Sequence, residues 1–129
     1  MSDFGDSGCV CWGGTGTAAT GATGGAAVGV AVGVRVGVGV ALVRAGDTTR
    51  GRQFLEQVGT LQATSEEQAS LRDRANLALG FTLLQQPGGD DPTAVLSRVR
   101  LDGPFTNKAL LALGWAEANA SRPDRALVP

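Results

Sequence analysis

The side chains of this chain that can do chemistry are few. It contains no histidine and no tyrosine, which removes the commonest general base, a common neutral metal ligand and the phenolic acids. Cys9 and Cys11 are too close in sequence to bridge each other easily, and no further Cys or His completes a zinc site. No nucleophile–base pair stands out. We therefore expect no catalysis, no bound metal and no cofactor.

One glycine-rich stretch has the pattern of a phosphate-binding loop. Residues 14–19, which begin at Gly14 and end at Ala19, fit G-x-G-x-x-A. A working dinucleotide loop needs a strand before it, a helix after it and an acidic residue about 20 positions on. No acidic residue lies between Asp6 and Asp47. Nucleotide binding by this stretch is therefore a remote alternative.

The composition changes near residue 46. Residues 1–46 hold 13 of the 20 glycines and only four charged side chains, whereas ten acidic and nine basic residues follow. The formal net charge of −1 gives no electrostatic reason to expect a nucleic-acid partner. We expect a disordered, low-complexity Gly/Val/Thr/Ala-rich tract over residues 1–46, followed by a folded domain over residues 47–129.

The Val-Gly alternation of residues 28–41 leaves several interpretations open. An alternation with a period of two residues matches a β-strand, but the glycines would leave the second face of that strand without side chains to pack. Residues 26–43 carry one charge and approach the length of a membrane span, although Gly and Val are poor helix formers and Arg35 lies near the middle. A membrane-anchored scaffold held by residues 26–43 is therefore an alternative. A tandem DNA repeat would also encode the alternation.

The second part of the chain carries helical signals and no strand signal. Apolar spacing predicts one helix over residues 48–58 and a second from a Ser65 cap, with Gln68 completing a capping box, to just before Pro87. Further helices are expected from Pro92 through Val99, from a Thr106 cap to about residue 120, and from Pro123. Short connections imply antiparallel neighbours, so the predicted fold class is all-α, built from helix hairpins.

A short motif occurs twice in this helical part. "ANLALGF" spans residues 75–81 and "ALLALGW" spans residues 109–115, so Gly80 pairs with Gly114. A repeat of this length, about 34 residues built from two helices, is typical of a helical solenoid. Because glycine inside an exposed helix costs about 1 kcal/mol relative to alanine, two equivalent glycines predict close contact between paired helices.

The repeat resembles the tetratricopeptide-repeat (TPR) family over about residues 47–129. Asn76, Pro92 and Glu117 depart from the family pattern. The family pattern has positions for large residues, for small residues and for proline. The residues that match these positions are Leu79, Gly80, Leu83, Leu96, Val99, Pro104, Leu113, Gly114 and Ala126. The resemblance implies a TPR-like α-solenoid.

The likeness extends to exported, uncharacterised TPR-containing proteins of Gram-negative bacteria. It implies a periplasmic or exported location and a fragment of a longer helical array. A secretory signal fits badly, because it requires a Lys or Arg before its apolar run and none is present here.

The resemblance also implies a binding surface for a protein or peptide partner. Solenoids of this family bind partners on the face lined by the first helix of each pair. The stacked residues here are Arg74 with Lys108 and Phe81 with Trp115, a basic and aromatic combination suited to peptides. Alternatively, the two aromatic rings seal the contact between neighbouring helices and the two bases are merely solvated. We expect a protein–protein interaction or scaffold module without catalysis.

Overall fold

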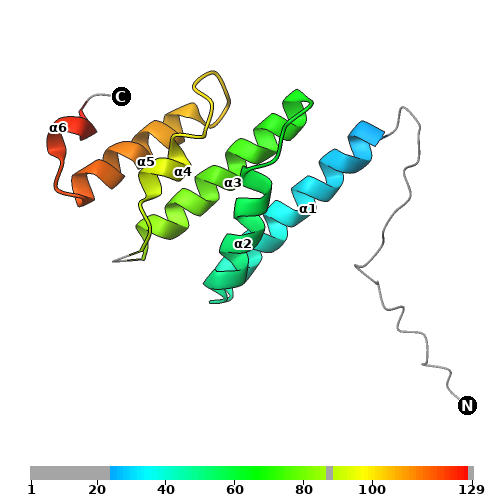
Figure 1. The fold of residues 1–129 in the computed structure, drawn as a ribbon, viewed down its shortest axis with the longest axis horizontal. Helices are drawn as coiled ribbons and strands as arrows, with labels where there is room; N and C mark the ends of the chain where they lie inside the picture. The colour runs from blue at the N-terminus through cyan, green and yellow to red at the C-terminus, as the bar shows by residue number, and fades with distance from the viewer. Residues whose placement is uncertain (1–23, 87–88, 128–129) are drawn as a thin grey trace, which may run out of the picture.

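The computed structural model describes residues 24–86 and 89–127 of the chain. These residues form six helices and no strand, which confirms the all-α prediction (Figure 1). The helices are α1 (Gly24–Arg44), α2 (Thr48–Gly59), α3 (Glu66–Leu84), α4 (Pro92–Leu96), α5 (Thr106–Asn119) and α6 (Pro123–Ala126). The two cysteines and the glycine-rich loop at residues 14–19 lie outside the described residues.

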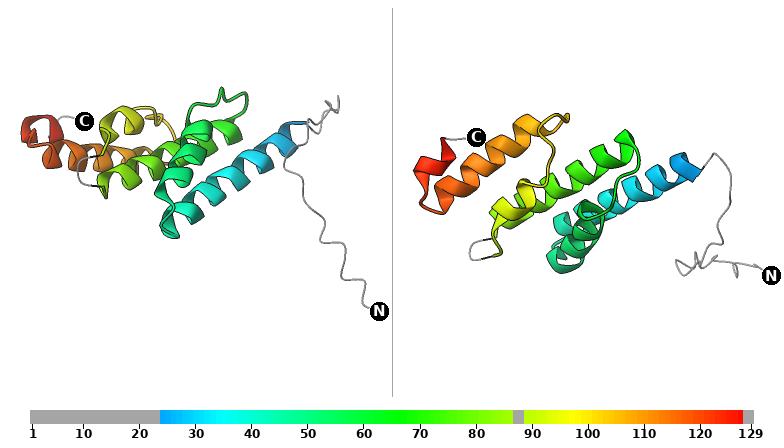
Figure 2. Two further views of the ribbon diagram at one scale, coloured as in Figure 1. Left: turned by 60° about the horizontal axis from the view of Figure 1, so that its bottom comes forward. Right: turned by 45° about the horizontal axis from the view of Figure 1, so that its top comes forward.

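The helices form three consecutive pairs. Helix α1 packs on α2, α3 packs on α4, and α5 packs on α6. The first helices of the pairs also contact one another, so that α1, α3 and α5 lie side by side in a row (Figures 1 and 2). This row places α1 at one end and α5 at the other.

The structure corrects the expectation of disorder for part of the tract over residues 1–46. Residues 24–44 form helix α1, neither a strand nor a disordered segment. In a helix, residues three or four apart share a face, and Val32 and Val36 are accordingly buried, with Val40 and Val43 packed beside them. Contact with α2 and α3 outweighs the poor helix propensity of Val and Gly.

Glycines allow α1 and α2 to approach backbone to backbone. A Cβ atom added at Gly51 would lie 2.8 Å from the carbonyl oxygen of Gly39 and 2.9 Å from the amide nitrogen of Val43. No side chain fits at that distance. The glycine at residue 51, a weak point for an isolated helix, is therefore what lets α2 dock on α1.

Two predicted helix starts are confirmed by their hydrogen bonds. The hydroxyl of Ser65 accepts from the Gln68 amide at 3.3 Å and caps α3. The Gln68 side chain reaches back to accept from the Thr64 amide at 3.0 Å, one residue earlier than a standard capping box. Asp91 caps α4 by accepting from the Thr93 amide at 2.9 Å, with Pro92 in the first turn.

Two other boundary predictions are wrong. Helix α4 ends at Leu96 instead of continuing through Val99, because tight turns follow in which the Val99 amide donates to the Leu96 carbonyl at 3.1 Å. Thr106 is the first residue of α5 and does not cap it. Its hydroxyl donates to the carbonyl of Gly103 at 2.7 Å and so holds the preceding loop.

The predicted close contact at Gly80 is confirmed. A Cβ atom added at Gly80 would lie 2.6 Å from Cγ of Leu96, a leucine of α4 that is 0% exposed. The first helix pair has the same arrangement, since a Cβ at Gly39 would lie 2.9 Å from Cγ of Leu55. The sequence separation between glycine and leucine is identical in the two pairs, and Leu55 is also 0% exposed.

The contact at Gly114 is looser than the one at Gly80. A Cβ atom at Gly114 would lie 3.4 Å from the carbonyl oxygen of Ala126, which is an ordinary van der Waals distance. Helix α6 ends at Ala126 and supplies no buried leucine to press on α5. The predicted close contact between paired helices is therefore found at Gly80 and not at Gly114.

A methyl group at Gly80 tests the packing of the second pair. Gly80→Ala is expected to lower the free energy of unfolding by about 1–3 kcal/mol, because the buried Leu96 has no free space to move into. Gly33 is the matched control, since a Cβ there would lie 3.8 Å from Cδ2 of Leu71, an ordinary van der Waals contact. Gly33→Ala is expected to raise stability by about 1 kcal/mol through helix propensity. Equal shifts of both variants in urea denaturation would refute the contact.

Candidate binding surface

The four predicted partner-binding residues lie on two neighbouring helices of the row. Arg74 and Phe81 belong to α3, whereas Lys108 and Trp115 belong to α5. All four are exposed, with Phe81 at 40% and Trp115 at 63%. Helices α3 and α5 contact each other, so the surface rests on adjacent elements.

A buried contact beneath this surface holds the two helices together. Leu77 of α3 is 7% exposed and shares a core cluster with Ala109 and Ala112 of α5. Because alanines line the α5 side, the helices can approach closely. The row therefore presents its exposed side chains from a rigid support, as a binding surface requires.

The two basic side chains of this surface have no ion-pair or hydrogen-bond partner in the described part of the chain. Neither the Arg74 nor the Lys108 side chain takes part in any hydrogen bond or ion pair among residues 24–86 and 89–127. Other arginines pair with carboxylates, as Arg98 does with Glu56 at 2.7 Å. The combination of two free cations with two exposed rings suits an acidic, apolar segment.

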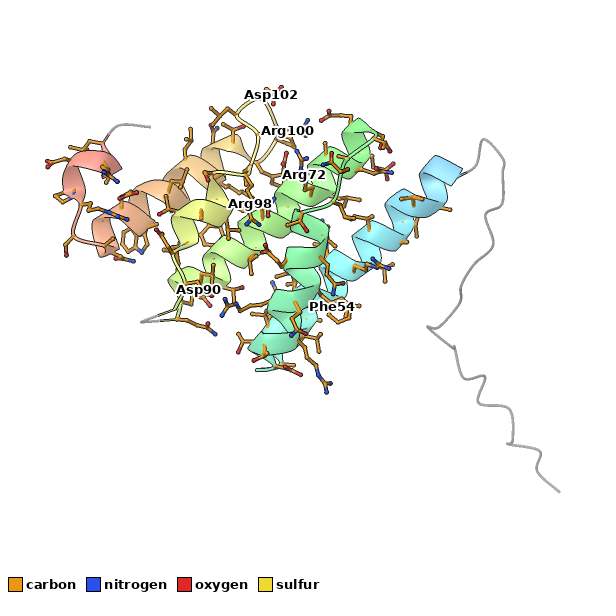
Figure 3. The ribbon with its side chains drawn as sticks, in the orientation of Figure 1. Phe54, Arg72, Asp90, Arg98, Arg100 and Asp102 are labelled. Atoms are coloured by element: carbon orange, nitrogen blue, oxygen red, sulfur yellow. The ribbon has the colours of Figure 1, made fainter. Side chains whose placement is uncertain are left out.

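Sequence reasoning missed a charged cluster that fastens α3 to the loop after α4 (Figure 3). The guanidinium of Arg100 donates to both oxygens of Glu66 at 2.9 Å and to Asp73 at 2.8 Å. Asp73 is 0% exposed. The hydrogen bonds from Arg100 lower the pKa of Glu66, and those carboxylates raise the pKa of Arg100. Nothing in the residue spacing identifies these partners.

A second buried polar contact explains one departure from the TPR pattern. Asn76 of α3 is 0% exposed, and its Nδ2 donates to the carbonyl of Gly59 at 3.1 Å. That carbonyl lies at the end of α2, where backbone acceptors lack partners within the helix. A Cβ at Gly59 would overlap Oδ1 of Asn76, so the glycine and the asparagine belong together.

A hollow of about 790 Å³ lies between α3, α4 and α5 and includes Leu84, Asp91 and Arg122 in its wall. None of the four surface residues lines it. Hydrogen bonding to Thr93 lowers the pKa of Asp91, whose carboxylate caps α4. No group of three His, Cys, Asp or Glu side chains that could hold a metal ion occurs in the described part of the chain.

The geometry thus offers binding surfaces on a rigid row of helices. The buried charged side chains form contacts between helices. Comparison of this chain with protein-family models, with curated proteins and with solved structures found no match.

Proposed function

We propose that this chain is a TPR-like module that binds a protein or peptide partner and has no catalytic activity. The observation that carries the proposal is the repeated packing of a glycine beneath a buried leucine. It occurs at Gly39 with Leu55 and at Gly80 with Leu96. Repeated helix pairs that stack in a row create extended binding surfaces, and this supports an interaction role.

The ligand class follows from the exposed side chains of α3 and α5. Arg74 and Lys108 carry positive charge, and Phe81 and Trp115 offer aromatic faces. Aromatic and arginine side chains are the residues that most often carry binding energy at interfaces. An extended peptide with carboxylates and apolar side chains is therefore the partner proposed.

Selection from a random peptide library provides the test. The wild-type chain is expected to enrich peptides that combine Asp or Glu with Leu, Phe or Trp. Arg74→Ala and Trp115→Ala are each expected to weaken a selected peptide about tenfold, or about 1.4 kcal/mol, because each removes an anchor. Isothermal titration calorimetry measures the loss.

Arg50→Ala is the matched control, since Arg50 is an exposed arginine on α2. It is expected to leave peptide affinity unchanged. Failure to enrich any peptide, or equal losses in the Arg50 and Arg74 variants, would refute the proposed surface.

Anchoring in a membrane through residues 26–43 is the second candidate. The segment of α1 from Ala27 to Arg44 is long and apolar enough to cross a bilayer, by length and composition alone. Spanning would separate α1 from α2 and expose the face that buries Val32 and Val36. The packing therefore favours the interaction module. If the chain floats with lipid vesicles and loses this behaviour when residues 26–43 are removed, the membrane candidate would be favoured instead.

A further inference from the structure

Helices α1 and α3 meet through two apolar faces. Both helices contribute to one core cluster, which includes Val36, Val40 and Val43 of α1 and Leu71, Ala75 and Ala78 of α3. A Cβ atom at Gly33 of α1 would lie 3.8 Å from Cδ2 of Leu71, so the two helices approach closely there.

Helices α3 and α5 repeat this contact in the same register. Superposing Gly39 on Gly80 aligns α1 with α3, and superposing Gly80 on Gly114 aligns α3 with α5. With this alignment, the second core cluster contains five of the six equivalent residues: Leu77, Leu84, Phe105, Ala109 and Ala112. The sixth, Phe81, is equivalent to Val40 and lies outside the cluster. One type of helix contact thus occurs twice.

Each end of the row carries one half of that contact. Helices α1 and α5 lie at the two ends of the row (Figure 2). By the alignment, α1 carries the equivalents of the α3 residues that face α1, and α5 carries the equivalents of the α3 residues that face α5. The same alignment defines the α1 end face as Val30, Val34 and Gly37. It defines the α5 end face as Leu111, Trp115 and Ala118.

One residue of each end face is exposed where its internal equivalent is buried, whereas Phe81, the internal equivalent of Trp115, is itself 40% exposed. Ala75 is 0% exposed, but Val34, its equivalent on α1, is 45% exposed. Leu77 is 7% exposed, but Leu111, its equivalent on α5, is 72% exposed. In the described part of the chain, neither end face is covered by another helix.

We propose that a second copy of this chain covers these faces, head to tail. The α5 end face of one copy would pack on the α1 end face of the next and form the internal contact a third time. The sizes are complementary, because Trp115 and Leu111 are large while a Cβ at Gly37 meets nothing within 4 Å. Neither face includes a charged residue.

The two surfaces that meet in this contact are different, so the association is heterologous. Each copy keeps one free end face after the first contact, and further copies add to it. The expected product is an open series whose mean length grows with protein concentration. Self-association is a property beyond the proposed peptide binding. Trp115 belongs to both surfaces, whereas Val34 and Leu111 belong to the end faces alone.

Two charge substitutions at exposed positions test the contact with the full chain. Val34→Glu blocks the α1 end face, and Leu111→Glu blocks the α5 end face. Light scattering after size exclusion is expected to show wild-type mass rising with concentration. Each variant alone is expected to be monomeric, because every contact needs both faces. An equal mixture is expected to form a 1:1 heterodimer that grows no further, since each variant supplies one intact face.

Leu101→Glu is the matched control, because Leu101 is 73% exposed and lies outside both end faces. It is expected to associate like the wild type. Circular dichroism verifies that all variants keep their helices. A wild-type chain that stays monomeric overturns the proposal, as does a single variant that still dimerises or a mixture of folded variants that forms no heterodimer. A monomer that floats with phosphatidylcholine vesicles through α1 overturns it in favour of a membrane.

Discussion

Leu96→Ala is expected to lower the free energy of unfolding by about 2–5 kcal/mol, the cost of removing a buried leucine and leaving a cavity. Leu96 is 0% exposed and belongs to the second core cluster, where it lies directly over Gly80. Urea denaturation measures the change. Helix α4 has only five residues, so its position depends on this side chain more than on its own hydrogen bonds.

Leu101→Ala is the control for Leu96→Ala, because Leu101 is 73% exposed. It is expected to change stability by less than about 0.5 kcal/mol. The double variant Gly80→Ala/Leu96→Ala adds a second test. The shortened side chain leaves room for the new methyl group, so Gly80→Ala is expected to cost little in that background. Additive losses would show that the two residues do not touch.

Arg100→Met is expected to lower the free energy of unfolding by about 3 kcal/mol. The variant leaves the Asp73 carboxylate, which is 0% exposed, without its partner at 2.8 Å. Methionine keeps the apolar stem of the side chain but removes all three hydrogen bonds to Glu66 and Asp73. The loss in free energy of unfolding on breaking a buried ion pair varies with burial, and the lower end of its range applies here because Arg100 is itself 24% exposed. Thermal denaturation near neutral pH measures the loss.

The pH dependence of stability tests the pairing of Glu66 with Arg100. Hydrogen bonding to Arg100 lowers the pKa of Glu66 below its ordinary value of 4.5. Its contribution to stability is present above pH 4.5 and is lost as the pH falls through the lowered pKa. Glu66→Gln is therefore expected to flatten the fall in melting temperature below pH 4.5. Arg100→Met is expected to flatten this fall in the same way, because it removes the partner of Glu66. A wild-type slope in either variant would contradict the pairing.

The sequence predicted most of the helices because their local signals agree with their final environment. Ser65 and Gln68 cap α3 where the pattern placed the cap, and Asp91 with Pro92 begins α4. These signals act over a few residues, so they can be read without knowing what the helix packs against. Gly80 likewise occupies the close contact that its cost in a helix predicted.

The candidate surface was predictable only in part. The resemblance to the TPR family implied Arg74 and Phe81, which lie exposed on α3, and Lys108 and Trp115, which lie exposed on α5. It did not distinguish Leu77, which is buried, from its repeat equivalent Leu111, which is 72% exposed. The two residues occupy the same position of the motif, and only the presence of a neighbouring helix separates them.

By itself, the sequence determined the all-α class, the main helix starts and the repeat that relates α3 to α5, because caps, turns and periodicity are local properties. The tertiary structure decided the rest. Residues 24–44 become helical because α2 and α3 bury Val32 and Val36, although the propensity of that segment is poor. Arg100 meets Glu66 and Asp73 only after α3 and α4 have packed. Contacts between residues distant in the chain stabilise both the helix over residues 24–44 and the Arg100 cluster. No local sequence pattern reveals these contacts.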